Sequence, residues 1–217
     1  MTGIAAVVDG RRARGDSTRR AILARSMQLA STGGLEDLSI AQLANDLGMS
    51  KSGLFAHFGS KEELQLSTVR AARRVFSDEA VTPAMEVEPG IWRLQALLDT
   101  WFEYIGSDTF VGGCLLMGAA AEFDNRPGRV RDLIAETMDM WMCLLVGEAK
   151  RALELGELEP GADAAQLAWE LHAYGLGLNW DHQLNDSVVA VERARTAIDT
   201  RLALAATAKG RRRIAKP

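Results

Sequence analysis

The amino-acid sequence predicts an all-α protein, and three observations support this fold class. Apolar residues recur with the 3.6-residue period of an α-helix along nearly the whole chain. No segment shows convincing β-type alternation, and no hairpin dipeptide separates β-branched runs. Serine, glycine and proline stand where the apolar runs begin and end. The chain has 217 residues, of which 47% are hydrophobic, enough for a small domain joined to a larger one.

The chain opens with a basic segment of small residues, and we expect a flexible arm over residues 1–15. The first helix should begin after a cap at Asp16 or Ser17. It should end at Gly33-Gly34, because glycine tolerates the left-handed conformation that follows many helices. The cationic residues of the arm are Arg11, Arg12 and Arg14.

Serine residues are expected to cap the next three helices. A serine hydroxyl at a helix start can accept a hydrogen bond from an amide two or three residues further on. The expected caps are Ser39, Ser50 and Ser60. The helices begin at Ser39, Lys51 and Lys61 and extend to about residues 47, 57 and 75. Gly48 separates the first two of them. A helix, a glycine turn and a second helix within so few residues predict a helix-turn-helix, so residues 16–62 are assigned to a three-helix DNA-binding head.

The larger remainder, residues 63–208, is predicted to be an antiparallel helical domain, followed by a basic tail over residues 209–217. Glycine, proline and asparagine divide its apolar runs into separate helices. These helices are expected at 91–106, 109–123, 127–155, 163–184 and 187–207.

The net charge of −4 conceals a strong asymmetry along the chain. Residues 1–74 contain 11 Lys and Arg against 7 Asp and Glu, a balance of +4. Residues 75–217 contain 14 against 22, a balance of −8. A polyanion should therefore be attracted to the amino-terminal head and repelled by the rest of the chain.

Other classes of protein receive little support. No apolar run is long enough for a membrane span and no signal-peptide pattern is present, so we expect a cytoplasmic protein with no membrane partner. Cys114 and Cys143 lack zinc-site spacing and are expected to be buried thiols. His57, His172 and His182 have no further ligands at metal spacing, so no metal or cofactor is expected. No catalytic motif is present, and we do not expect an enzyme.

The starts of the short helices carry features suited to nucleic acid. Exposed amides give a helix start a partial positive charge, so the serine caps can face phosphates. Lys51 and Lys61 add full positive charge, whereas the small residues Ser52 and Gly53 let the backbone approach base edges. Each feature alone is ordinary on a solvated helix. Together with the segregated charge they favour DNA binding.

The run from Ser50 to Leu64, SKSGLFAHFGSKEEL, resembles the pattern S-K-x-x-L-Y-x-H-F-x-S-K-E-x-L of the TetR-family transcriptional regulators. Gly34-Leu35-Glu36 also resembles the approach to the second helix in that family. The resemblance implies phosphate contacts by Ser39, Lys51, Phe55, His57 and Lys61, and base contacts by Ser50, Ser52 and Gly53.

Two residues depart from the family pattern. Phe55 replaces a common tyrosine and has no hydroxyl for a phosphate, so its contact must be apolar. Ala41 stands where arginine is frequent and offers no charge. For His57 a second interpretation stays open, in which the partly buried ring ties the short helix to its neighbours.

Past Leu64 the resemblance is weaker, although Gly113 to Leu116 and Glu122 to Arg131 look like one class of TetR carboxy-terminal domain. That domain implies binding of a small effector and formation of a homodimer. Aromatic and methionine side chains suit an apolar pocket, although each one alone is better explained as part of the core. The candidate pocket residues are Trp92, Trp101, Phe102, Met117, Met138, Trp141, Trp169 and Tyr174.

The last two predicted helices carry more apolar surface than a terminal hairpin needs. Gly175 and Gly177 lie inside one of them, which suggests close backbone packing against a neighbour. We expect a two-fold partner there, which would place two recognition helices on a pseudo-palindromic operator. The candidate interface residues are Trp169, Leu176, Val191, Ile198 and Leu202.

The sequence thus predicts a dimeric, sequence-specific repressor that binds double-stranded DNA and is released by a small, largely apolar effector. A transcriptional activator of the same fold is one alternative. The other is an architectural protein that binds any DNA sequence through both basic tails.

Overall fold

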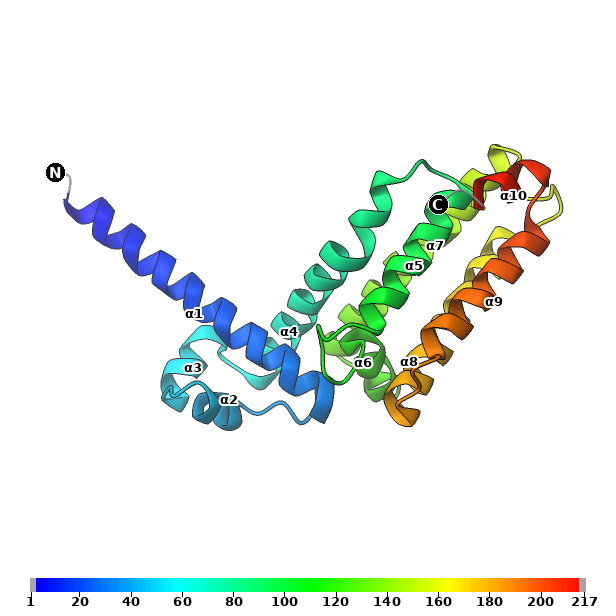
Figure 1. Ribbon diagram of the computed structural model, residues 1–217. Helices are drawn as coiled ribbons and strands as arrows, with labels where there is room; N and C mark the ends of the chain where they lie inside the picture. Colours follow the sequence, from blue (N-terminus) through cyan, green and yellow to red (C-terminus); the bar gives the residue numbers. More distant parts are fainter. Residues whose placement is uncertain (1–2, 215–217) are drawn as a thin grey trace.

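The computed structural model describes residues 3–214, with side chains described from residue 15 onward, and these residues form an all-α protein as predicted. A small amino-terminal head is joined to a longer helical body (Figure 1). The head contains α1 (Gly3–Gly33), α2 (Ile40–Asp46), α3 (Lys51–Phe58) and the start of α4 (Lys61–Phe76).

The body begins where α4 leaves the head and continues through two short irregular turns, η1 (Ser77–Val81) and η2 (Pro83–Glu86). Three consecutive helices form its centre, and two more pack antiparallel on the side away from α4 (Figure 1). The helices of the body are α5 (Ile91–Ile105), α6 (Leu115–Phe123), α7 (Arg129–Glu154), α8 (Ala164–Asn185), α9 (Ala190–Ala205) and α10 (Ala208–Ile214). None of the helices in the described part of the chain combines the length and apolar character needed to cross a bilayer.

The head is held together by the apolar faces that the sequence pattern predicts. Ile22 of α1, Leu43 of α2 and Leu54 of α3 are each fully buried. Leu64 at the start of α4 is also fully buried, so the connecting helix belongs to the core of the head as well as to the body. Burial of such a side chain contributes about 1.5–3 kcal/mol.

The start of the first helix differs from the prediction. α1 begins at Gly3 rather than after Asp16 or Ser17, so residues 3–15 extend the helix. In Figure 1 this amino-terminal part projects away from the rest of the head. The arm arginines lie outside the residues whose side chains are described.

The start of α6 also differs, because the helix begins at Leu115 rather than at residue 109. Gly113 has a φ of +77°, a left-handed conformation that interrupts a helix. A Cβ on Gly112 would lie 1.7 Å from the Ser31 carbonyl oxygen, so the loop packs directly against the end of α1. The helical pattern over these residues is therefore overridden by contact with the head.

Head and body are also joined by a carboxylate. Glu122 of α6 accepts hydrogen bonds from the backbone amides of Leu35 and Glu36, at 2.7 and 2.9 Å. Nearby, Arg129 of α7 pairs with Glu62 and Glu63 at 2.9 and 2.8 Å. The turn between α1 and α2 is therefore anchored on α6.

The predicted basic tail is largely a helix, α10, which lies at the end of the body away from the head (Figure 1). Its cations meet carbonyl groups at helix ends: the ammonium of Lys209 donates to the Leu155 oxygen at 2.7 Å, and Arg211 donates to the Ala206 oxygen at 2.5 Å. The Arg213 guanidinium lies over the Trp92 ring, 5.5 Å from its centroid. These cations stabilise the fold of the body.

Candidate functional site: a candidate DNA-binding surface and a partly open cavity

The first turn of α3 is an exposed helix start with a serine cap. The Ser50 hydroxyl accepts a hydrogen bond from the Gly53 amide at 3.0 Å and lies 3.2 Å from the Ser52 hydroxyl. Lys51 and Ser52 are exposed, and Gly53 is partly so. The three residues expected to approach DNA therefore lie together on an unobstructed tip.

The opposite face of α3 faces the core of the head. Leu54 and Phe58 are buried, whereas Phe55 is 51% exposed and is one of the large apolar side chains on the surface. His57 is half-buried, with its ring 6.3 Å from that of Phe58, so its position is compatible with both interpretations given above.

Arg19 of α1 fixes α3 in place, and nothing in the sequence had singled it out. Its guanidinium donates to the His57 carbonyl oxygen at 2.5 Å and to the Ser67 hydroxyl at 3.0 Å. It also lies over the Phe58 ring, 4.4 Å from the centroid. One side chain thus ties α1 to both α3 and α4. In the sequence it is indistinguishable from its exposed neighbour Arg20.

Lys61 and Ser39 already have partners within the head. The Lys61 ammonium pairs with Glu36 at 3.2 Å, although both side chains stay well exposed. A hydrogen bond from Gln65 and the nearby Lys61 ammonium lower the pKa of Glu36. Ser39 is half-buried, and its hydroxyl accepts from the Gln42 amide at 3.3 Å as the predicted cap.

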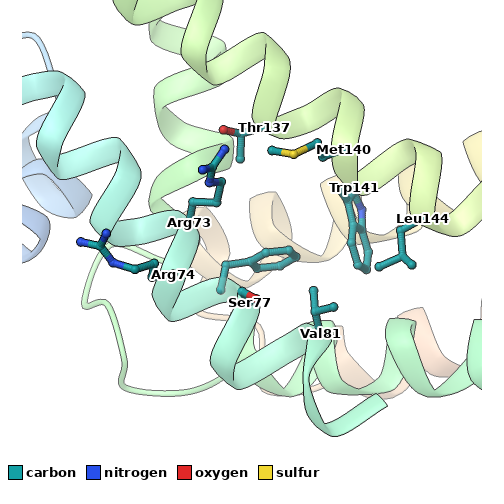
Figure 2. A pocket seen from close by; sticks show the side chains of 9 residues that line it. Arg73, Arg74, Ser77, Val81, Thr137, Met140, Trp141 and Leu144 are labelled. Carbon is teal, nitrogen blue, oxygen red and sulfur yellow. The ribbon is translucent and has the colours of Figure 1, made fainter. Parts of the chain in front are cut away.

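The body contains a cavity of about 320 Å³ between α4 and α7. Figure 2 shows the Trp141 ring at one wall, with side chains of α4 and η1 opposite. A much smaller cavity, of about 20 Å³, lies beside it and shares Phe76, Thr137 and Trp141. The larger of the two, called the outer cavity, is lined by Arg73, Arg74, Phe76, Ser77, Val81, Thr137, Met140, Trp141 and Leu144. The inner cavity is lined by Phe76, Trp101, Cys114, Leu116, Met117, Thr137, Met138, Trp141 and His172.

Aromatic side chains form the wall between the two cavities. The rings of Phe76 and Trp141 meet edge to face, with centroids 5.2 Å apart. The Trp141 indole N–H donates to His172 Nδ1 at 3.3 Å, and Trp101 stacks on the same imidazole at 5.3 Å. Burial lowers the pKa of His172, which favours the neutral ring, and a neutral ring can accept this hydrogen bond at Nδ1.

Four of the predicted pocket residues line the inner cavity: Trp101, Met117, Met138 and Trp141. The other four line neither of the two cavities. Phe102 is fully buried, Trp92 lies beneath α10, and Trp169 is on the outer face of α8. Tyr174 is half-buried.

The contribution of α4 to the cavity was not expected, because its sequence was interpreted only as a connecting helix. Phe76, Arg73 and Arg74 all come from its last turn. The basic residues there were visible in the sequence, but their proximity to α7 depends on the tertiary structure.

The outer face of α8 is apolar and exposed. Its exposed side chains recur at helical spacing: Trp169, Leu176, Trp180 and Leu184 are 61%, 46%, 61% and 65% exposed. Trp180 was missing from the candidate interface, although it follows Leu176 by one helical turn. Leu204 of α9 is 75% exposed.

Three predicted interface residues of α9 face inward instead. Ile198 and Leu202 are fully buried within the chain, so these two assignments were wrong. Val191 is half-buried, and its side chain packs against Gly106 of the α5 end. The apolar period of α9 that contains Ile198 and Leu202 therefore marks the face that packs on α5 and α8.

The two glycines of α8 have different surroundings. A Cβ on Gly175 would lie 2.2 Å from two carbons of the Trp101 ring, so this glycine lets α8 approach α5 within the chain. A Cβ on Gly177 would meet no atom within 4 Å. The close packing expected at these positions is thus intramolecular for Gly175.

The cysteine and histidine residues form no metal site in the described residues, where no three His, Cys, Asp or Glu side chains gather around a common point. Cys114 is buried as expected, and burial raises the pKa of its thiol to about 11. Cys143 is exposed on α7, contrary to the expectation that both thiols are buried.

Comparison with known proteins agrees with this architecture. Residues 22–67 match the family model for bacterial regulatory proteins of the tetR family, and residues 90–198 match the tetracyclin repressor-like C-terminal domain. No curated protein sequence matches the chain.

Solved structures share the fold. A TetR transcriptional regulator from Chloroflexus aurantiacus has a TM-score of 0.82 at 23% identity, over 89% of this chain and 98% of that one. A transcriptional regulator from Saccharomonospora viridis, solved with choline, has a TM-score of 0.70 at 21% identity, over 85% and 95%. AibR, solved with isovaleryl coenzyme A and operator DNA, has a TM-score of 0.65 at 19% identity, over 82% and 94%.

The head resembles the DNA-binding domain, and the body the carboxy-terminal domain, of a single family of regulators that are not enzymes. The chain belongs to the TetR family of transcriptional regulators.

Proposed function

We propose that the protein is a dimeric repressor that binds a pseudo-palindromic operator and is released by a small, largely apolar effector. The observation that carries this proposal is that one chain has two exposed surfaces, the capped tip of α3 and the apolar face of α8. The tip of α3 suits the major groove of DNA, and the face of α8 suits another copy of the chain.

The α3 tip supports sequence-specific binding. A recognition helix reads base edges through its first residues, and here those residues are Lys51, Ser52 and Gly53. Their small or flexible side chains leave the backbone accessible, and Phe55 adds an apolar contact surface on the same helix. Apolar side chains of this kind can contact a thymine methyl group.

The outer face of α8 supports the homodimer. Exposed clusters of large apolar side chains on a water-facing helix are normally covered by a partner. In a two-fold arrangement Trp169, Leu176 and Trp180 would pack against their copies, because a two-fold interface uses the same patch on both subunits. Tryptophan is also among the residues that dominate interface energetics.

The position of the outer cavity supports control by an effector. The cavity lies between α7 and the last turn of α4, and α4 follows directly after α3. A ligand that binds there with different affinity for two positions of α4 would change the separation of the two heads. Among proteins of this fold, one was solved with choline and another with an acyl coenzyme A and operator DNA.

Selection of duplexes from a random-sequence pool by the full-length protein tests the proposal. We expect enrichment of a two-fold symmetric sequence whose half-sites are spaced by whole turns of about 10 base pairs. A reporter with that sequence at its promoter should be silenced by the protein, whereas increased expression would indicate an activator. A pool that stays random after selection would identify an architectural binder.

The architectural alternative is weakened by the location of α10. Lys209 and Arg211 donate to carbonyl oxygens, and Arg213 pairs with Glu88 at 2.7 Å. These groups lie at the end of the body opposite the head (Figure 1). A duplex bound to α3 therefore does not meet them.

A further inference from the structure

We propose that the effector site between α4 and α7 selects a planar apolar molecule with an anionic group, and that Arg73 binds the anion. This inference rests on the proposed function, because it names the class of ligand for the same cavity. The cavity volume of about 320 Å³ falls within the range of sites for small molecules.

The charge of the lining favours an anion. Arg73 and Arg74 are the titratable residues among those that line the outer cavity, and both are cationic. In Figure 2 the guanidinium of Arg73 reaches toward Thr137, whereas that of Arg74 points away from the other labelled side chains. An anion inside the cavity would therefore be bound by Arg73, whose planar group can donate two parallel hydrogen bonds to a carboxylate.

Two other polar groups of the wall, on Thr137 and Trp141, are already engaged. The Thr137 hydroxyl donates to the Leu133 carbonyl oxygen at 2.7 Å, and the Trp141 indole N–H donates to His172. Neither hydrogen is available to a ligand without breaking an existing bond. This leaves Arg73 as the donor that a ligand in the cavity would meet, together with the Ser77 hydroxyl.

The remaining wall is aromatic and apolar. Phe76 and Trp141 stand edge to face at 83°, so a planar ligand can lie against one ring and meet the edge of the other. Met140, Leu144 and Val81 complete the wall, and the methionine can adapt to the outline of the ligand. An aryl carboxylate combines the two required properties.

Among the residues whose side chains are described, one acidic residue competes for Arg73. Glu136 of α7 lies 3.7 Å from its guanidinium, and the side chains are 38% and 63% exposed. An ion pair this exposed and this long is weak, so a ligand carboxylate can replace Glu136. Removing the Glu136 charge should therefore strengthen anion binding, which is the opposite of the effect of removing Arg73.

Calorimetric titration of the full-length protein with three matched probes tests the ligand class. The probes are 2-naphthoate, its neutral analogue 2-naphthamide, and the cation 2-naphthylmethylammonium. We expect naphthoate to bind roughly tenfold more tightly than naphthamide, as a charge-assisted hydrogen bond exceeds a neutral one. The cation should bind most weakly.

Three variants test whether Arg73 is the residue that binds the anion. Arg73→Gln should reduce naphthoate affinity roughly tenfold to that of naphthamide and leave naphthamide binding unchanged. Glu136→Gln should raise naphthoate affinity and leave naphthamide binding unchanged. Arg74→Gln, the matched control, should alter neither, because its guanidinium points away from the cavity. Circular dichroism and thermal unfolding of each variant establish that the fold is retained.

The outcomes separate this inference from the proposed function. Equal affinity for naphthoate and naphthamide, tightest binding of the cation, no binding of any probe, or an unchanged preference in Arg73→Gln would each overturn the anionic ligand class. None of these results concerns operator binding, which is measured on the same samples without a probe. Failure of the wild-type protein to bind any operator would instead contradict the proposed function.

Discussion

The tip of α3 and the outer face of α8 are both exposed to solvent, but their side chains differ in kind. At the tip of α3 the exposed residues are Lys51 and Ser52, whereas at α8 they include Trp169 and Trp180. A polar, cationic helix start loses little by staying in water and binds a polyanion when one is present. Exposure of large indole rings to water is unfavourable, so a surface of this kind favours a partner that covers it permanently. We therefore expect the tip of α3 to bind its partner reversibly and the outer face of α8 to form a lasting interface.

Each surface is also held in place by a different kind of contact behind it. Arg19 fixes α3 from within the head by hydrogen bonds and a ring contact. Gly175 lets α8 approach the Trp101 ring without a side chain in between. The first contact is polar and local to the head, and the second is a steric fit in the body. Substitutions can therefore disturb either surface independently.

The largest expected effect is on the α8 surface. Trp180→Glu would place a charge in the proposed dimer interface, where its desolvation is unfavourable, and we expect monomers in sedimentation velocity. Because binding of one head then no longer assists the other, affinity for a symmetric operator should fall by about 100-fold or more.

Met85→Glu is the matched control, since Met85 is an exposed apolar residue of η2 outside the proposed interface. It should stay dimeric and bind the operator normally. A Trp180→Glu protein that sediments as the wild type would refute the assignment of the α8 face to the dimer.

The next effect concerns the contact behind α3. Arg19→Met removes both hydrogen bonds from the guanidinium while keeping much of the side-chain volume, and should lower the free energy of unfolding by about 2 kcal/mol. Urea denaturation at a fixed protein concentration measures the change. Arg20→Met, at the exposed neighbouring position, should change it by less than about 0.5 kcal/mol. Equal effects of the two substitutions would mean that the Arg19 contacts contribute no net stability.

These contacts show where prediction from the sequence succeeds and where it stops. The caps at Ser39, Ser50 and Ser60 were predicted correctly, because capping is a local interaction within a few residues. The start of α6 was wrong by several residues, because the loop before it is shaped by the Ser31 carbonyl of a distant helix. Local sequence signals thus predict that the helices form, whereas contacts between distant residues determine where some of them begin.

The same distinction applies to the cavity and the interface. Trp101 and Trp141 were predicted as pocket residues because aromatic side chains are conspicuous, but Arg73 was not, because its neighbours come from α7. The α9 residues Ile198 and Leu202 have the right chemistry for an interface and the wrong orientation. Hydrophobic periodicity shows that a helix has an apolar face but does not show what covers it.

The two glycines of α8 provide a smaller and more selective test. Gly175→Ala would place a methyl group within the Trp101 ring, and overpacking of this kind costs about 1–3 kcal/mol. Gly177→Ala meets open space in the single chain, so it should stabilise the helix by up to about 1 kcal/mol.

Both glycine substitutions are then made in the Trp180→Glu background, expected to be monomeric, and in the wild-type background, expected to be dimeric. Thermal unfolding should show the stabilisation by Gly177→Ala only in the monomer, if the partner helix approaches closely at that position. An equal gain in both backgrounds would mean that the partner leaves this part of α8 uncovered.

The smallest expected effect compares two lysines of the head. Lys51 is exposed at the α3 tip, whereas Lys61 already pairs with Glu36 at 3.2 Å. Lys51→Ala should reduce the slope of log affinity against log salt by about 1 and weaken binding roughly fivefold at about 0.15 M salt, whatever the DNA sequence. Lys61→Ala should have a smaller effect, because DNA must compete with Glu36 for its ammonium. Glu36→Gln frees that ammonium and should strengthen binding. Fluorescence anisotropy over a salt series measures all three, and a larger loss from Lys61→Ala than from Lys51→Ala would show that the ion pair opens completely on DNA.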